Sequence, residues 1–187
     1  MCFSFEVSIS TFLISWGISL YLLNKGLNKN HKQNVVALMI FSSIQLADAI
    51  LWFNKMKVNN INYVVSSYII PLILSLQIIY NVFVRNNNNK NIYITIISII
   101  YIIYLFNKLN GYSISLNNYF KSPIWGANDF KIWEILLFTL LIFYPRWSYV
   151  YYALIWFGLV MVFANGAYGS LWCAVANMWA LFYLYKY

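Results

Sequence analysis

Apolar residues run through this chain in long stretches, separated by short connections rich in Asn and Lys. Stretches of this length and apolar content are typical of helices that cross a bilayer. The pattern predicts seven spans, at about residues 6–23, 34–53, 62–84, 92–106, 131–144, 148–164 and 168–185. We therefore expect an all-α fold, a polytopic transmembrane helix bundle that forms a single domain over residues 1–187.

Helix-breaking residues mark two places in this pattern. Pro71 lies in the middle of the third interval, where its missing amide hydrogen should kink the helix. The longest connection, 108–130, contains Gly111, Pro123 and Gly126, and Trp125 is one of its aromatic anchors. Such a segment is typical of an interfacial or partly re-entrant loop.

The fourth and fifth intervals are shorter than the roughly 20 residues that a perpendicular crossing needs. Oligomerisation is one way in which a short span relieves a mismatch with the bilayer thickness. We therefore expect a homo-oligomer, a dimer or a trimer.

The composition supports a membrane protein. The chain is 63% hydrophobic, 21% aromatic and only 9% charged, and these proportions exclude an ordinary soluble domain. The net charge is +8, but the basic residues are scattered singly through the connections and form no continuous stripe for phosphate contacts. We expect the lipid bilayer as partner, an integral membrane location and no nucleic acid.

Basic residues on alternate sides of the predicted spans indicate the orientation. With the amino terminus outside, the inner connections hold seven of them and the outer connections five. This excess favours the amino terminus outside and the carboxyl terminus inside. All four acidic residues then fall on the outer side: Glu6, Asp48, Asp129 and Glu134. Except for Asp48, they lie close enough to the interface to be solvated helix caps.

Asp48 is the chief candidate for function because it lies inside an apolar interval. Burying an isolated carboxylate in a bilayer costs at least about 2.5 kcal/mol and requires a partner, a proton or a wet cavity. Gln45 lies one helical turn before it and Trp52 one turn after it, so all three share a face that must turn away from lipid. The candidate ligand- or ion-binding residues on the outer side are Asp48, Gln45, Glu6, Ser4, Ser8, Trp52 and Trp172.

Hydroxyl and amide groups in this outer half have a simpler explanation, since such groups commonly form hydrogen bonds between helices of a bundle. The residues to which this explanation applies best are Ser4, Ser8, Ser66, Ser67 and Asn177.

The usual catalytic arrangements are missing from the pattern. The single histidine, His31, falls in an inner loop, far from Cys2 and Cys173, so no base is placed beside a nucleophile. A His and Cys metal site lacks ligands as well, which leaves only oxygen atoms of Asp48 and Glu6 for a hard cation. No lysine lies in mid-span of the seventh interval, which excludes retinal. We expect no catalytic residues, no metal site and no cofactor.

Cys2 and Cys173 are candidates for a disulfide. The predicted orientation places both near the outer side, and the first and last helices of a closed bundle are usually neighbours. The Cα atoms could then approach the separation of about 4.4–6.8 Å that a disulfide requires. The alternative is a pair of free thiols that pack as small apolar groups.

Three short stretches carry a resemblance to a known family. They are Met1-Cys-Phe-Ser4, Gln45-x-x-Asp48 with the following Leu51-Trp52, and Ser170-Leu-Trp-Cys173. Together they resemble an uncharacterised family of small polytopic membrane proteins of bacteria and large DNA viruses that begin Met-Cys-Phe-Ser. That family carries Gln-x-x-Glu in its second span, so Asp48 is a conservative departure, and Phe5 stands where the family usually has Ala.

The resemblance implies a seven-span membrane protein and no particular activity. It singles out nearly the same residues that topology gathers on the outer side: Cys2, Ser4, Ser8, Gln45, Asp48, Trp52, Trp172 and Cys173. The bias toward Asn, Ile, Lys and Tyr resembles proteins from AT-rich genomes such as those of giant viruses, which would place the chain in a host-cell or virion membrane.

These observations favour an integral membrane transport or channel protein that moves a cation or a proton through an outward-facing polar cavity centred on Asp48. Carboxylates outside, basic groups at the inner rim and a proline in mid-span are all features of transport pathways. The alternative is a seven-span receptor or sensor that binds a small ligand in the same outer pocket. An enzymatic activity is not favoured.

Overall fold

The computed structural model describes residues 4–85, 91–115, 123–163 and 168–187, with backbone only for residues 156–163 and 168–174. Seven helical rods make up most of this described part. They are α1 (Phe5–Asn24); α2 (Lys29–Ser42) continued by α3 (Ile44–Phe53); α4 (Asn60–Val64), η1 (Val65–Ile69), α5 (Ile70–Ile79) and η2 (Tyr80–Arg85) in succession; α6 (Ile92–Lys108); α7 (Ile132–Phe143); α8 (Trp147–Phe163); and α9 (Tyr168–Lys186).

The all-α prediction is confirmed, and the rods follow the predicted intervals closely, although the second begins earlier, at Lys29. Three rods in the described ranges are long and apolar enough to cross a membrane: Phe5–Asn24, Lys29–Phe53 and Asn60–Arg85. Two others, Ile92–Lys108 and Ile132–Phe143, are apolar but shorter. Seven crossings and the orientation stay predictions.

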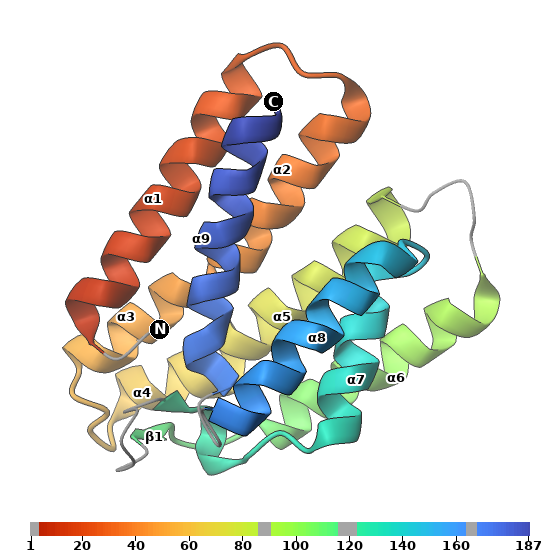
Figure 1. Ribbon diagram of the computed structural model, residues 1–187. Helices are drawn as coiled ribbons and strands as arrows, with labels where there is room; N and C mark the ends of the chain where they lie inside the picture. Colours follow the sequence, from red (N-terminus) through yellow and green to blue (C-terminus); the bar gives the residue numbers. More distant parts are fainter. Residues whose placement is uncertain (1–3, 86–90, 116–122, 164–167) are drawn as a thin grey trace.

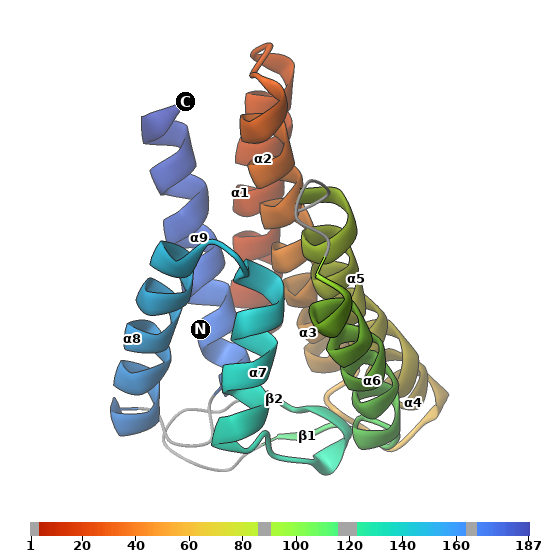
Figure 2. The ribbon, with the colours of Figure 1, turned by 90° about the vertical axis from the view of Figure 1, so that its right-hand side faces the viewer.

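Consecutive rods run in alternating directions, so the bundle has two distinct ends (Figure 1). We call the end that contains residues 109–115 and 123–127 the loop end. The end at which α9 finishes is called the C-terminal end. The rods α1, α2 and α9 project beyond the others at the C-terminal end (Figure 2). Because α1 and α7 begin at the loop end and α3 finishes there, all four acidic residues lie toward it.

Local sequence signals explain where several helices begin. A side chain that accepts a hydrogen bond from an unpaired backbone amide stabilises the first turn of a helix. Asn28 and Asn59 serve α2 and α4 in this way, through the backbone N–H of His31 and of Asn62. Ser4 caps α1 by accepting from the N–H of Val7 at 3.3 Å. Ser4, one of the predicted ligand-binding residues, thus stabilises the start of a helix.

The third rod is irregular around Pro71. The π-helical segment η1 ends directly before Ile70, whose N–H donates to the carbonyl of Val65, and Pro71 is the second residue of α5. A widened turn of this kind accommodates a residue that cannot donate a backbone hydrogen bond. The helix is therefore widened directly before Pro71, and the predicted kink stays a prediction.

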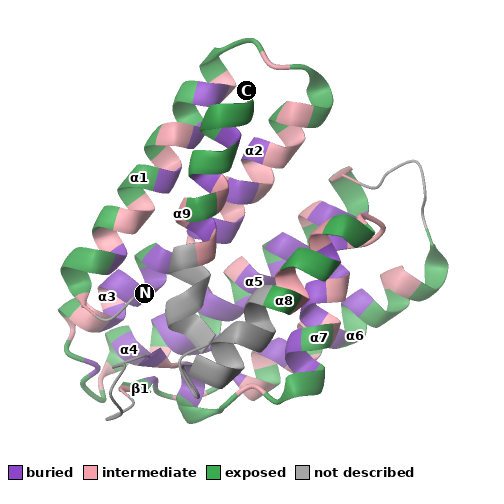
Figure 3. Ribbon diagram, viewed as in Figure 1, coloured by how far each residue is buried: buried purple, intermediate pink, exposed green. Residues whose placement is uncertain are grey.

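Two apolar clusters fill the bundle. The main one involves every rod except α1, and its completely buried members include Ile44, Leu51, Ile70, Ile78, Leu105 and Leu141. The smaller one lies between α1, α2 and α9 and is made by Leu22, Val35, Leu38, Ala180 and Tyr183. Exposed positions lie along every rod (Figure 3). Many of them are large apolar residues, for example Ile100 at 61% and Tyr152 at 67% exposure. Such extended exposed apolar surface is typical of a membrane or partner contact.

The long connection after α6 covers the loop end. Its described part contains β1 (Ile114–Ser115) and β2 (Pro123–Ile124), which pair antiparallel, followed by a 3₁₀ turn, η3 (Trp125–Ala127). Within this connection, the side chains of Leu109 and Trp125 are buried. The described part of this connection therefore places an indole ring inside the bundle. Its predicted depth in a bilayer stays a prediction.

Candidate functional site

Asp48 is completely buried on α3, as the sequence predicts. Its Oδ1 accepts a hydrogen bond from the indole Nε1 of Trp125 at 2.8 Å. Its Oδ2 is enclosed as well, and no donor among the described residues reaches it. Burying a polar atom without a hydrogen bond costs free energy, so this oxygen marks a position for a proton, a cation or a water.

The packing of α3 determines the depth of Asp48. The helix lies against α1, α5, η1 and α9, so little of its surface is left for lipid. Gln45 is also completely buried one turn before Asp48, and the half-buried Trp52 packs against the main core. The polar face of Gln45 and Asp48 therefore points into the bundle, as the helical spacing predicts.

The other predicted site residues are placed differently. Ser8 is buried, but its hydroxyl donates to the backbone carbonyl of Ser4 at 2.9 Å within the same helix. Glu6 is exposed at the start of α1 and is not enclosed with Asp48. The two carboxylates therefore do not form a joint oxygen-rich cation site in this structure.

The side chains of three predicted residues lie outside the described part of the structure. Cys2 lies outside the described residues, as do the side chains of Trp172 and Cys173. The disulfide between Cys2 and Cys173 and the role of Trp172 stay predictions.

Trp125 is the partner of Asp48 that sequence reasoning missed. Its position in a loop with glycine and proline breakers indicates an interfacial aromatic anchor and gives no signal of a hydrogen bond to α3. The two residues are separated by 77 positions and share no helical periodicity. Only the fold of the connection brings them together.

A buried polar network fixes this connection to the third rod. Asn62 and Ser66 both receive the backbone N–H of Ser113, at 2.8 Å and 3.1 Å, and the hydroxyl oxygens of Ser66 and Ser113 lie 2.6 Å apart. Asn62 donates in return to the carbonyl of Ser113 at 2.9 Å. These residues tie the loop to α4 and η1, two turns that pack near α3. Ser66 therefore has a structural role, but its partners are a connection and its own rod and not another helix.

Two further features hold Trp125 in place. Ser67 accepts the backbone N–H of Gly111 at 3.0 Å and donates to the carbonyl of the same residue at 3.3 Å. Gly126 adopts a φ of +61°, and a Cβ on it would lie 2.8 Å from the backbone oxygen of Leu109. Only glycine fits this position without strain, so the residue next to Trp125 is fixed by a close backbone approach.

Glu134 differs from its expected role as a solvated cap. It does cap α7, because its Oε2 accepts the backbone N–H of Lys131 at 2.6 Å. However, the carboxylate is buried and forms an ion pair with the Lys108 ammonium at 2.6 Å, and the Tyr104 hydroxyl donates to it. The expectation of full solvation is wrong because α6 returns alongside α7 and encloses the first turn.

Neither a family model, nor a curated protein, nor a solved structure matches this chain. The resemblance to the family that begins Met-Cys-Phe-Ser therefore stays a prediction. Within the described ranges no three His, Cys, Asp or Glu side chains cluster as metal ligands would. The arguments that follow rest on the geometry of this chain.

Proposed function

We propose that this protein is an integral membrane transport protein in which Asp48 binds a proton or a small cation inside the helix bundle. The observation that carries the proposal is the burial of this carboxyl group together with the hydrogen bonding of its two oxygens. It is completely buried, Trp125 satisfies one oxygen, and no described donor satisfies the other. A carboxylate in this state inside a membrane protein marks an ion or proton pathway by default.

The membrane setting is supported by three rods of crossing length and by the apolar outer surface. In the proposal the seven rods cross the bilayer in turn, with the loop end outside and the C-terminal end inside. The acidic residues then lie toward the outside, and the inner rim carries basic residues such as Lys29, Lys32 and Arg146. This distribution agrees with the excess of basic residues on the inner side of membrane proteins.

A series of buried polar atoms extends the pathway away from Asp48. Ser75 on α5 and Thr139 on α7 are buried, and their hydroxyl oxygens find no partner within the described residues. The helices α5 and α7 pack against each other. Buried polar groups of this kind are normally satisfied by water, so they support a hydrated route through the bundle along which a proton can move.

Trp125 closes the outer entrance in this proposal. Its buried indole donates to Asp48 from the connection at the loop end, and the network of Asn62, Ser66 and Ser113 ties this connection to the third rod. The structure then corresponds to a state in which the Asp48 carboxylate has no exposure to the outer solution. Transport requires the connection to move so that Asp48 alternates between the two sides.

Flux through purified protein tests the proposal. The full chain is reconstituted in liposomes, and a K⁺ gradient with valinomycin imposes the potential. A trapped pH indicator measures proton flux, and a trapped Na⁺ indicator measures cation flux. We expect proton or cation flux from the wild type. Asp48→Asn should abolish it, because the substitution removes the charge with little change of shape.

Glu6→Gln provides a matched control. It also removes one negative charge at the loop end, but from an exposed side chain, and flux should stay at the wild-type level. Absence of flux from folded wild-type protein, or equal flux from Asp48→Asn, would overturn the transport function. Loss of flux in both variants would assign the effect to surface charge and would remove Asp48 from the pathway.

A further inference from the structure

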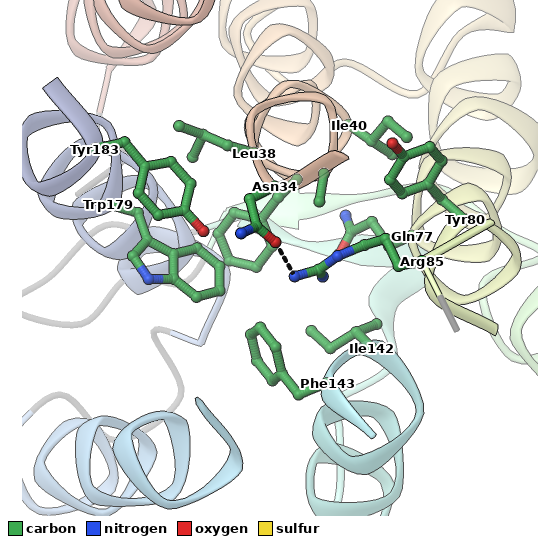
Figure 4. A pocket seen from close by; sticks show the side chains of 12 residues that line it. Asn34, Leu38, Ile40, Gln77, Tyr80, Arg85, Ile142, Phe143, Trp179 and Tyr183 are labelled. Carbon is green, nitrogen blue, oxygen red and sulfur yellow. Dashed lines mark hydrogen bonds between the residues drawn. The ribbon is translucent and has the colours of Figure 1, made fainter. Parts of the chain in front are cut away.

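A pocket with several polar side chains in its lining lies toward the C-terminal end of the bundle, away from Trp125. It is enclosed by α2, α5, η2, α7 and α9, is partly open to the surface and contains a cavity of about 20 Å³ (Figure 4). A cavity of this size accommodates a water molecule or a single oxygen of a larger group. The side chains of Arg85, Gln77 and Asn34 contribute its polar lining, and Phe143, Trp179 and Tyr183 contribute its aromatic wall.

Arg85 places a positive charge in this pocket. Its Nη2 donates to Oδ1 of Asn34 at 2.7 Å, and its Nη1 donates to Oδ1 of Asn81 at 3.4 Å. Its Nε is enclosed and finds no acceptor in the described part of the chain. Both acceptors are neutral amides, so the hydrogen bonds leave the charge uncompensated.

Among the described residues no acidic side chain pairs with Arg85. All four acidic side chains belong to described residues, and the ion pair found among these residues joins Lys108 to Glu134 at the loop end. Arg146 adds to the imbalance, because its Nη1 lies 3.5 Å from the same Asn81 oxygen and its Nη2 lies 3.4 Å from the carbonyl oxygen of Arg85. Two guanidinium groups held together with neutral acceptors, and with no carboxylate among the described side chains, favour the binding of an anion.

Gln77 provides an independent sign of a missing occupant. Its side chain is only 6% exposed, lines the same cavity, and has both amide atoms without a partner among the residues described. An amide buried in this state costs free energy unless something binds to it. Its NH₂ group can donate to an oxygen that sits beside the guanidinium of Arg85.

We propose that this pocket is a binding site for an oxyanion, a phosphate or carboxylate group, with Arg85 as its charge partner and Gln77 as its second donor. The planar guanidinium matches the geometry of such groups, and the aromatic wall strengthens the attraction by excluding water. One oxygen enters the cavity, and the rest of the ligand lies toward the opening. The proposal does not depend on the transport function.

The oxyanion has two sources that the test must separate, a soluble anion and a lipid headgroup. The full chain in detergent is titrated with inorganic phosphate by calorimetry. In a second arm, native mass spectrometry measures adducts with phosphatidic acid and with phosphatidylcholine. Binding of phosphate alone indicates a soluble ligand, and preferential binding of phosphatidic acid indicates a headgroup.

Three variants decide whether the site is the one described. Arg85→Gln should weaken binding at least about tenfold, because hydrogen bonds to a charged group are lost. Gln77→Leu should also weaken binding, yet it should raise the unfolding temperature of the free protein, because it removes buried atoms that have no described partner. Lys32→Gln removes an exposed positive charge at the same end and should bind like the wild type.

The opposite results would overturn the oxyanion site. Failure of the wild type to bind either probe removes the proposal, as does equal binding by the wild type and Gln77→Leu. A loss in Lys32→Gln as large as that in Arg85→Gln would reduce the effect to surface charge. If Arg85→Gln does not fold, Gln77→Leu decides alone, because its stability and its affinity are expected to change in opposite directions.

Discussion

The indole nitrogen of Trp125 lies 2.8 Å from a carboxylate oxygen of Asp48 and donates a hydrogen bond to it. Both side chains are buried, and they come from a connecting loop and from the second rod. A hydrogen bond to a buried charged group is stronger than one between neutral groups. This pair therefore joins the connection between α6 and α7 to the buried carboxyl group of Asp48.

The first prediction concerns this hydrogen bond. Trp125→Phe keeps an aromatic ring but removes the donor, which leaves both oxygens of Asp48 without a described partner. We expect the free energy of unfolding in detergent to fall by about 1.5–3 kcal/mol. Trp133→Phe, at an indole that is 52% exposed, is the matched control and should change stability little. Equal effects of the two substitutions would mean that the hydrogen bond contributes nothing specific.

The second prediction concerns the backbone next to Trp125. Gly126→Ala introduces a Cβ 2.8 Å from the Leu109 oxygen at a φ of +61°, so the loop must shift or accept strain. We expect a loss of about 1–3 kcal/mol in unfolding free energy. Gly17→Ala is the control, because a Cβ at this exposed helical position meets nothing within 4 Å. Thermal unfolding of the two variants side by side checks the difference, and a stable Gly126→Ala would contradict the close approach.

The third prediction concerns the ion pair between Lys108 and Glu134. Removing one partner of a buried pair leaves an uncompensated charge, so Lys108→Met should cost about 3 kcal/mol of stability. The double variant Lys108→Met/Glu134→Gln should lose less than the sum of the two single losses, because neither charge is left alone. Chemical denaturation of the four proteins measures this coupling. If the losses of unfolding free energy in the two single variants add up to the loss in the double variant, the Lys108 and Glu134 side chains do not stabilise each other.

Much of the fold is predictable from the sequence because lipid-compatible helices leave a strong local signal. The apolar intervals indicate where the seven rods begin and end, and Pro71 indicates the irregular turn in the third. The burial of Asp48 is also predictable, since a carboxylate and an amide spaced one turn apart on an apolar helix must face inward. Each of these inferences depends on neighbours within a few positions of one another.

The tertiary structure alone decided the partners of these groups. Trp125 reaches Asp48 because the chain between α6 and α7 folds back over the loop end, and no local periodicity encodes that return. Arg85 looks like an ordinary rim charge in the sequence, yet α2 and α7 enclose it beside Gln77. Glu134 looks like a solvated cap, yet α6 brings Lys108 against it. Local pattern determines which face of a helix is buried, whereas the packing of distant segments determines which atoms meet there.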